Sequence, residues 1–447
     1  MRDLRSVAAD DDRISVRAWL TLVILGSMLV LSYLDRGILS LLVEPIRKDL
    51  HITDVDISLL QGLAFGVFYA LFAFPLGWLA DRYSRRGVIF FCITGWSLAT
   101  TACGLAGSFW QLAAARLCVG IGEGGLSPAA YRIIGDLFPP RRLGMALGIF
   151  SAGASLGLPV AIILGGAIVT WAASQGSMSL PLFGDVQPWQ LVFLVLGPPG
   201  LLIAPLIFIA PRGARVQKQP SEPAAVKAPQ GKPADGYGAF LRSRMKYLTL
   251  HFSGYSMIAM IAYGAGAWAP TYFQRRFGLS MVEIGLFLGV INAGCGMIGH
   301  AGWGWVVDRW FSRGVKDAHI RLYAITFPLI GVGAVVAYGL ADSPLMAFAA
   351  LPIVHLLMPF TAPAVGHLQL ATPVEYRGRT TALFTMVFNI VGAALGPLIV
   401  AILTEHVFRD PAKVGLSIAT MAAAAAALGT IIFVFCLKPA RNAISAA

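Results

Sequence analysis

The sequence predicts an all-α membrane protein that crosses the bilayer twelve times, as two bundles of six helices. Three observations support this fold class. Of the 447 residues, 57% are hydrophobic and only 13% are charged, and the mean hydropathy is +0.73. Long apolar runs alternate with short basic clusters, which is typical of membrane spans. One ten-residue pattern also occurs twice, at the same place in each half of the chain.

The apolar runs set the number and order of the helices, because about 20 apolar residues are needed to cross roughly 30 Å of hydrocarbon. We expect the first six spans near residues 18–43, 57–80, 88–107, 110–133, 143–172 and 189–210. We expect the second six near residues 247–270, 283–306, 320–341, 344–371, 378–403 and 414–437. The intervening segment carries prolines and charged residues and predicts a polar linker. The predicted division is 1–210, 211–246 and 247–447.

Lysine and arginine are concentrated in the loops on one side of the predicted bundle. They crowd the N-terminus, the linker and the loops after the second, fourth, eighth and tenth spans. Because such loops stay in the cytoplasm, we expect both termini to be cytoplasmic, in a bacterial inner membrane. Residues 1–17 lack the apolar core of a cleavable signal, so we expect the first span to be retained. This distribution of the net charge of +12 argues against nucleic-acid binding.

The repeated pattern follows the second span of each half. Glycine, aspartate, arginine and a final arginine recur with identical spacing at Gly77, Asp81, Arg82 and Arg86, and again at Gly304, Asp308, Arg309 and Arg313. A match in spacing, position and sidedness indicates duplicated halves, and many transporters bind substrate between such halves. We expect Asp81 and Asp308 to join arginine and helix-end contacts that close the cytoplasmic side in the outward-open state.

The first copy of this pattern resembles the signature of the major facilitator superfamily in the loop between helices 2 and 3. The fourth span contains Arg116-x-x-x-Gly120-x-Gly122-Glu123-Gly124, which resembles the superfamily's fourth-helix motif. More narrowly, the first half resembles the Spinster branch of lipid transporters, through Tyr33-Leu-Asp35-Arg36, Phe65-x-x-Phe-Tyr69 and Pro75-x-Gly77. The resemblance implies the major facilitator fold and a lipid-like substrate.

Four charged residues lie within apolar spans: Asp35, Arg36, Arg116 and Glu123. Each charge at mid-bilayer costs a few kcal/mol, so such residues face the bundle interior and find partners. Arg116 and Glu123 are two helical turns apart and share a face of the fourth span. We count residues inward from the outer ends of the first and fourth spans, at about 1.5 Å per residue. Asp35 and Arg116 then lie at similar depth, and Glu123 lies deeper, near Arg36. This predicts the pairs Asp35–Arg116 and Arg36–Glu123. A purely structural ion-pair cluster remains the alternative.

These charges also suggest how protons and substrate are coupled. Desolvation raises the pKa of a buried carboxyl group, whereas a nearby guanidinium lowers it, so moving the guanidinium changes proton binding. We expect Asp35, and then Glu123, to carry protons, and Arg36 and Arg116 to bind an anionic group. Aromatic side chains suit the apolar part of the substrate. The aromatic candidates are Phe65, Tyr69, Tyr255 and Tyr263.

The function predicted from the sequence is proton-coupled transport of a lysolipid or another amphipathic organic anion. A carrier of small organic anions, sugar acids or drugs is the alternative within the same class. A membrane-embedded lipid enzyme is the alternative from another class, and it would need an acid–base pair or a metal set near one bilayer surface. We expect no enzyme activity, cofactor or metal. The expected partners are substrate, protons and the lipid bilayer, and the chain is expected to be a monomer.

Overall fold

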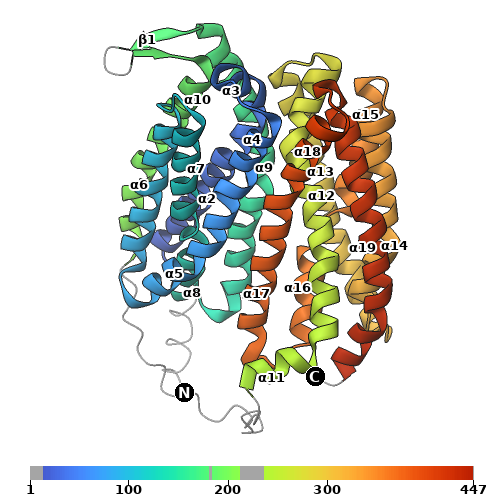
Figure 1. Cartoon of the computed structure of the whole chain (residues 1–447). Coiled ribbons are helices and arrows are strands. Elements are labelled where there is room, and N and C mark those ends of the chain that lie inside the picture. The colour runs from blue at the N-terminus through green and yellow to red at the C-terminus, as the bar shows by residue number, and fades with distance from the viewer. Residues whose placement is uncertain (1–13, 181–183, 212–235, 446–447) are drawn as a thin grey trace.

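The computed structural model of the chain describes residues 14–180, 184–211 and 236–445. Figure 1 shows two bundles of helices side by side, the first half in blue to green and the second half in yellow to red. A short antiparallel hairpin of β1 (Met178–Leu180) and β2 (Gly184–Val186) pairs Met178 with Val186. The predicted all-α membrane architecture is confirmed.

The first half is built from helices whose starts carry recognisable caps. Ser15, Ser84 and Ser108 accept hydrogen bonds from main-chain N–H groups and so begin α2, α6 and α7. The elements of this half are α2 (Val16–Leu41), α3 (Val43–Leu50), α4 (Asp54–Ser58), η1 (Leu59–Val67), α5 (Phe68–Arg82), α6 (Arg85–Cys103), α7 (Phe109–Glu123), α8 (Leu126–Leu137), α9 (Pro140–Gln175), α10 (Pro188–Ile203) and η2 (Ala204–Ile209).

The second half begins after a short helix, α11 (Gly236–Ser243), that ends the predicted linker. The rest of the predicted linker lies almost entirely outside the described residues. The elements of this half are α12 (Met245–Phe277), α13 (Met281–Ser312), α14 (Ala318–Ala334), η3 (Val335–Leu340), α15 (Pro344–Leu357), α16 (Thr361–Leu370), η4 (Val374–Tyr376), α17 (Arg377–Asn389), η5 (Ile390–Leu395), α18 (Gly396–Ile402), η6 (Leu403–Val407), η7 (Pro411–Lys413) and α19 (Val414–Ser445).

Ten helical stretches among the described residues are long and apolar enough to cross a membrane. The two other predicted spans, the fourth and the seventh, correspond to α7–α8 and α12. The fourth carries Arg116 and Glu123 and is interrupted at Gly124–Gly125. The tenth span is interrupted at the equivalent place, residues 358–360, between α15 and α16. Twelve spans are therefore consistent with the structure.

The two halves meet along pairs of helices in which glycine allows close approach. Packing of α9 against α13 and of η1 against η5 joins the halves. A Cβ added at Gly62 would lie 2.2 Å from the carbonyl oxygen of Ala393, and one at Gly166 would lie 2.3 Å from that of Met281. Both η1 and η5 are π-helical, an irregularity frequent at functional sites.

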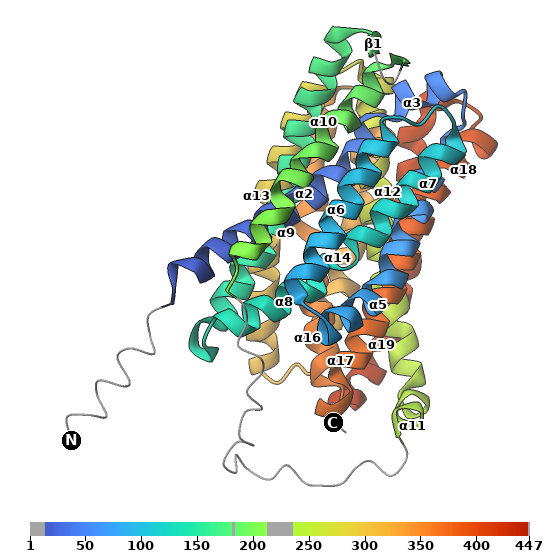
Figure 2. The same ribbon diagram turned by 90° about the vertical axis from the view of Figure 1, so that its left-hand side faces the viewer.

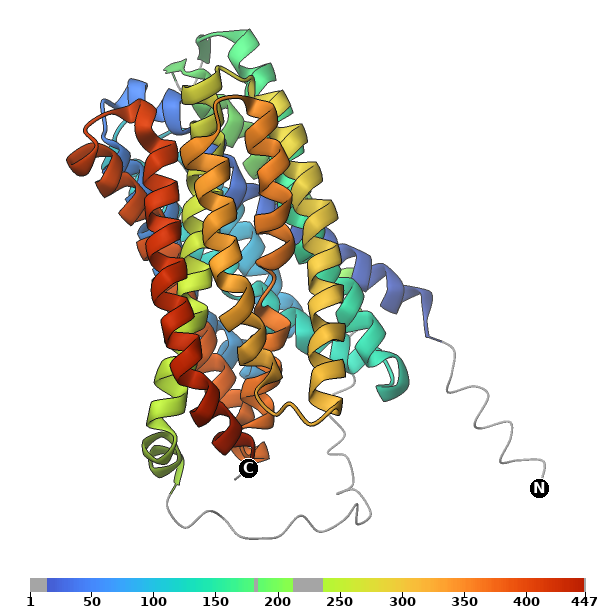
Figure 3. The ribbon, with the colours of Figure 1, turned by 90° about the vertical axis from the view of Figure 1, so that its right-hand side faces the viewer.

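The molecule has two distinct ends, which Figures 2 and 3 show from the sides. The end that carries α3, the start of α4 and the β-hairpin is called the α3 end. The opposite end, which carries α11 and the end of α19, is called the α11 end. The charge cluster of the first half lies between them, and a second polar cluster lies at the α3 end.

Candidate substrate site and inter-half latch

The buried charges of the first half form one connected cluster between α2 and α7. Nε of Arg36 donates to Oε2 of Glu123 over 2.6 Å, and the hydroxyl of Ser32 donates to the same oxygen over 2.6 Å. Glu123 is 1% exposed, whereas the side chain of Arg36 is 25% exposed. The predicted Arg36–Glu123 pair is therefore present, with Arg36 as its accessible member.

The second predicted pair differs in its atoms. Nη1 of Arg116 donates to the main-chain oxygen of Asp35 over 3.1 Å, rather than to its carboxylate. Oδ2 of Asp35 instead accepts from the hydroxyl of Thr100 on α6 over 3.3 Å. The expected Asp35–Arg116 ion pair is thus corrected. The two residues are neighbours, but the carboxylate points at α6 while Arg116 reaches the helix main chain.

Aromatic rings surround the guanidinium of Arg36. Its Cζ atom lies 5.3 Å from the ring centre of Tyr33, 5.0 Å from that of Phe65 and 4.4 Å from that of Tyr69. Phe65 also lies 5.4 Å from Cζ of Arg116. Cation–π attraction holds the two arginines against these aromatic rings. Phe65 and Tyr69, both predicted from the sequence, therefore line the charge cluster.

The two tyrosines predicted in the second half have different positions. Tyr263 on α12 is 40% exposed and within electrostatic range of Arg36 across the interface between the halves. Its hydroxyl donates to Oδ1 of Asn389 over 2.9 Å. Tyr255 does not join this site. It is fully buried in the core of the second half and donates to the main-chain oxygen of His319, because its face of α12 packs inward.

The residues of the repeated pattern contact their own halves. Arg86 donates to the main-chain oxygen of Ala210 over 2.9 Å. Arg82 and Arg309 are exposed and lie over Trp78 and Trp305. Asp308 and Arg313 are exposed, and Gly77 faces Pro128 of α8. The side chain of Asp81 lies outside the described residues, so its gating role stays a prediction.

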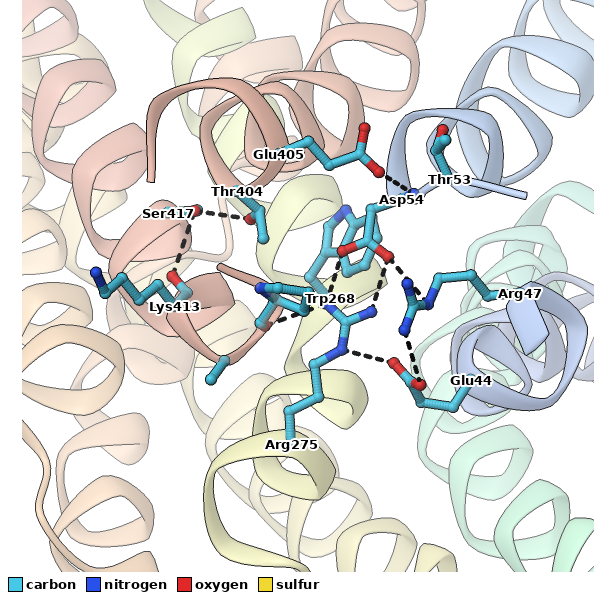
Figure 4. Close-up of polar contacts among 12 residues, drawn as sticks. Glu44, Arg47, Thr53, Asp54, Trp268, Arg275, Thr404, Glu405, Lys413 and Ser417 are labelled. Carbon is cyan, nitrogen blue, oxygen red and sulfur yellow. Dashed lines mark hydrogen bonds and ion pairs between the residues drawn. The ribbon is translucent and has the colours of Figure 1, made fainter. Parts of the chain in front are cut away.

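A polar cluster at the α3 end joins the two halves directly (Figure 4). Arg275 of α12 donates to both carboxylate oxygens of Asp54 on α4, over 2.6 and 2.7 Å, and to Glu44 on α3 over 2.6 Å. Arg47 lies 3.7 Å from Asp54 and 3.5 Å from Glu44. We call these four residues the inter-half latch. Because bidentate arginine–carboxylate pairs are strong and directional, the latch holds the α3 end closed.

Burial makes the loss of one latch partner costly, because the other charge would be left buried and unpaired. The side chains of Arg275 and Asp54 are 8% and 2% exposed. Cζ of Arg275 also lies 5.9 Å from the ring centre of Trp268, whose indole N–H donates to the main-chain oxygen of Pro397. The aromatic ring therefore covers the guanidinium from inside the bundle and keeps it aimed at the first half.

Sequence reasoning did not find the latch. Arg275 and Arg47 lie in predicted loops on the side opposite the linker, and no local sequence pattern pairs them with Asp54 or Glu44. The sequence does contain one signal for the latch: carboxylates and arginines occur together at the ends of predicted spans on the side of the bundle opposite the linker. Thr100 and Ser32, which contact Asp35 and Glu123, gave no signal because hydroxyl residues are common in membrane helices.

Comparison with known proteins identifies the family. Residues 25–397 match the model of the Major Facilitator Superfamily. The chain belongs to this superfamily of transporters. It is 28% identical over 396 residues to an MFS-type efflux pump of Mycolicibacterium smegmatis, covering 88% of this chain and 86% of that protein. It is 24% identical over 409 residues to the D-galactonate transporter of Escherichia coli, covering 90% and 92% of the two chains.

Solved structures place the fold more narrowly. The chain is similar, with a TM-score of 0.72 and 23% identity, to a bacterial homolog of the human lysosomal transporter Spinster in an inward-facing, unoccupied conformation. The likeness covers 96% of this chain and 98% of that chain. The predicted major facilitator fold is confirmed, and the fold resembles that of the bacterial Spinster homolog.

Proposed function

We propose that the chain is a secondary active transporter that moves an amphipathic organic anion, such as a lysolipid, by proton-coupled alternating access. The observation that carries this proposal is the environment of Arg36. Its Nε is bound to Glu123, its side chain is one-quarter exposed, and aromatic rings surround it. Tyr263 of the other half lies within electrostatic range. A ligand held there would contact both halves.

The chemistry of this position suits an anionic head with an apolar body. The guanidinium presents planar donors that match carboxylate and phosphate oxygens, and one edge is already fixed by Glu123. Phe65 and Tyr69 supply apolar surface beside it. An anion bound to Arg36 would weaken its hold on Glu123, which would then bind a proton more readily. Substrate and proton binding would thus reinforce each other.

Each of the two buried carboxylates has room for a proton. Oδ1 of Asp35 and Oε1 of Glu123 are buried without a hydrogen-bond partner among the described residues. Protonation of either oxygen would neutralise a carboxylate that burial disfavours, so these oxygens are the candidate positions for a proton. Asp35 remains our first candidate for the coupling proton, because its carboxylate has no ion pair within 4 Å among the described residues, and Glu123 is second.

Transport of a sugar acid is the second candidate. Tyr263 and Asn389 of the second half form a neutral hydrogen-bonding pair, which would suit the hydroxyl groups of a small carboxylate. The similar proteins include the D-galactonate transporter of Escherichia coli and the hexuronate transporter of Bacillus subtilis. In both candidates Arg36 binds the anionic group.

The distribution of basic residues supports a location in a bacterial inner membrane with the α11 end in the cytoplasm. The latch would then close the external side. We further propose that the chain acts as a monomer, because each half supplies one wall of the site and no second copy is needed to complete it.

Thermal unfolding in lipid nanodiscs with added ligands tests both candidates. The probes are a lysophosphatidic acid, galactonate and, as an uncharged control, galactose. A lysophosphatidic acid at about 100 times its dissociation constant should stabilise the protein by about 2.7 kcal/mol. This effect should vanish in Arg36→Ala and persist in Arg82→Ala, whose arginine is exposed and outside the site. Stabilisation by galactonate alone would favour the second candidate, and stabilisation by neither would reject both.

A further inference from the structure

Glu405 makes a second contact between the halves beside the latch. It extends from η6 of the second half to the first half, where Oε1 accepts a hydrogen bond from the main-chain N–H of Asp54. The N–H of Val55 lies 3.4 Å from the same oxygen. Figure 4 shows Glu405 reaching Asp54 from the side opposite Arg275. The partner of Glu405 is thus main chain, whereas the partner of Arg275 is a side chain.

These N–H groups begin the helical stretch that runs from Asp54 to Ala80. The first N–H groups of a helix have no partner within the helix. Thr53 and Asp56 form a capping box that satisfies the N–H groups of Asp56 and Thr53 from within the first half. Among the residues that the structure describes, the N–H groups of Asp54 and Val55 find their acceptor only across the interface. A carboxylate is also favourable at a helix N-terminus, where the helix dipole is positive.

We propose that Glu405 is a positioning residue of the transport cycle, which locks the α3 end closed through the main chain at the start of the second span. The proposal rests on the proposed alternating access. The start of this helix is then held twice, because the Asp54 carboxylate accepts from Arg275 while the Asp54 N–H donates to Glu405. A substitution of the Asp54 side chain would remove the first contact and leave the second in place.

A cavity lined by both halves lies beside Glu405. It has a volume of about 310 Å³ and is lined by residues of both halves, namely Arg47, Asp54, Thr404, Glu405, Arg409, Asp410 and Pro411. This space accommodates several water molecules, each of which takes up about 30 Å³ in liquid water. When Glu405 leaves, water can bind the freed N–H groups of Asp54 and Val55, so opening does not leave them unsatisfied.

Distances between spin labels across the α3 end test the proposal in substrate-free protein in nanodiscs. Genetically encoded labels at Lys48 and Leu345, exposed residues of the two halves, report the separation. Glu405→Ala should lower the ratio of closed to open populations about 10- to 100-fold, since it removes an acceptor of charge-assisted hydrogen bonds. Glu405→Gln keeps an acceptor oxygen at the same reach and should lose less than about tenfold.

Asp410→Ala is the matched control. Its carboxylate also lines the cavity and also accepts from a main-chain N–H, that of Ala412 over 2.9 Å, but within its own half. The control should leave the distances unchanged. Equal shifts in both alanine variants, or no shift in Glu405→Ala, would overturn the lock. If Arg275→Ala opens the α3 end while Glu405→Ala does not, the proposed transport cycle stands and only the role of Glu405 fails.

Discussion

Replacing Arg275 with alanine should open the α3 end of the protein. Arg275 supplies three hydrogen bonds from the second half to Asp54 and Glu44 in the first. In the open state the halves are apart at this end. Water would then hydrate Arg275, Asp54 and Glu44 separately, and the three side chains would not stabilise one another. The substitution therefore destabilises the closed state alone and shifts the population toward the open one.

The size of the shift follows from burial. Removing one partner of a buried ion pair costs about 3–5 kcal/mol, and the side chains of Arg275 and Asp54 are 8% and 2% exposed. Arg47 lies 3.7 Å from Asp54 and would take over part of the interaction, so we expect about 3 kcal/mol. At about 1.4 kcal/mol for each factor of ten, the closed-to-open ratio should fall roughly 100-fold.

The same label pair at Lys48 and Leu345 measures this change. The control is Arg276→Ala, which removes the neighbouring arginine. Its side chain is 52% exposed and lies 3.8 Å from Asp342, itself 93% exposed, and such pairs contribute between about 0 and 1 kcal/mol. If Arg275→Ala leaves the distances unchanged, or if both variants shift them equally, the latch does not control this end.

Three further predictions concern the site and the interface. Asp35→Asn should abolish the dependence of uptake on a pH gradient, measured in proteoliposomes with and without the gradient, because asparagine binds no proton. Gly62→Ala should shift the label distances toward the open α3 end, since its Cβ would lie 2.2 Å from the carbonyl oxygen of Ala393 in the closed state. Tyr263→Phe should weaken ligand-induced stabilisation with little effect on the unliganded protein. Tyr255→Phe should instead lower the stability of the unliganded protein by about 1 kcal/mol and leave the ligand effect intact.

Each of these three predictions has a control variant or an outcome that would contradict it. If Asp35→Asn retained full gradient-driven uptake, Glu123 rather than Asp35 would be the carrier of the coupling proton. Gly95→Ala serves as the control for Gly62, because a Cβ at Gly95 meets no atom within 4 Å. If Gly95→Ala shifts the distances as much as Gly62→Ala, close approach of the halves is not the cause. If Tyr255→Phe weakened the ligand-induced stabilisation and Tyr263→Phe lowered the stability of the unliganded protein, Tyr255 and not Tyr263 would face the ligand.

The sequence predicted most of the architecture because membrane spans are specified locally. Runs of apolar residues mark helices without any knowledge of their neighbours, and the cost of a buried charge singled out Asp35, Arg36, Arg116 and Glu123. Depth counting along two helices was enough for the Arg36–Glu123 pair, since both chain directions were known. It was not enough to say which atoms of Asp35 meet Arg116, because that depends on helix rotation and side-chain direction.

Contacts between distant span ends were not predictable in this way. Arg275 and Asp54 are 221 residues apart, and each looks like an ordinary charge at the end of a span. Their pairing depends on how two six-helix bundles dock, which no local pattern encodes. Tyr255 and Tyr263 illustrate the same limit within one helix. They are eight residues apart on α12, yet Tyr255 packs in the core of the second half, whereas Tyr263 is 40% exposed and bonds to Asn389.

The composition of the charge cluster has a consequence for the electrical behaviour of transport. Asp35, Arg36, Arg116 and Glu123 sum to zero when all four are ionised, and all four belong to the first half. Rocking of that half would then move no net charge through the membrane field. One added proton makes the set +1, and a bound monoanion returns it to zero. Co-transport of one proton together with one monoanion would therefore be electroneutral and insensitive to membrane voltage. A dianion carried with the same proton would leave one net charge to cross, worth about 2.3 kcal/mol per 100 mV.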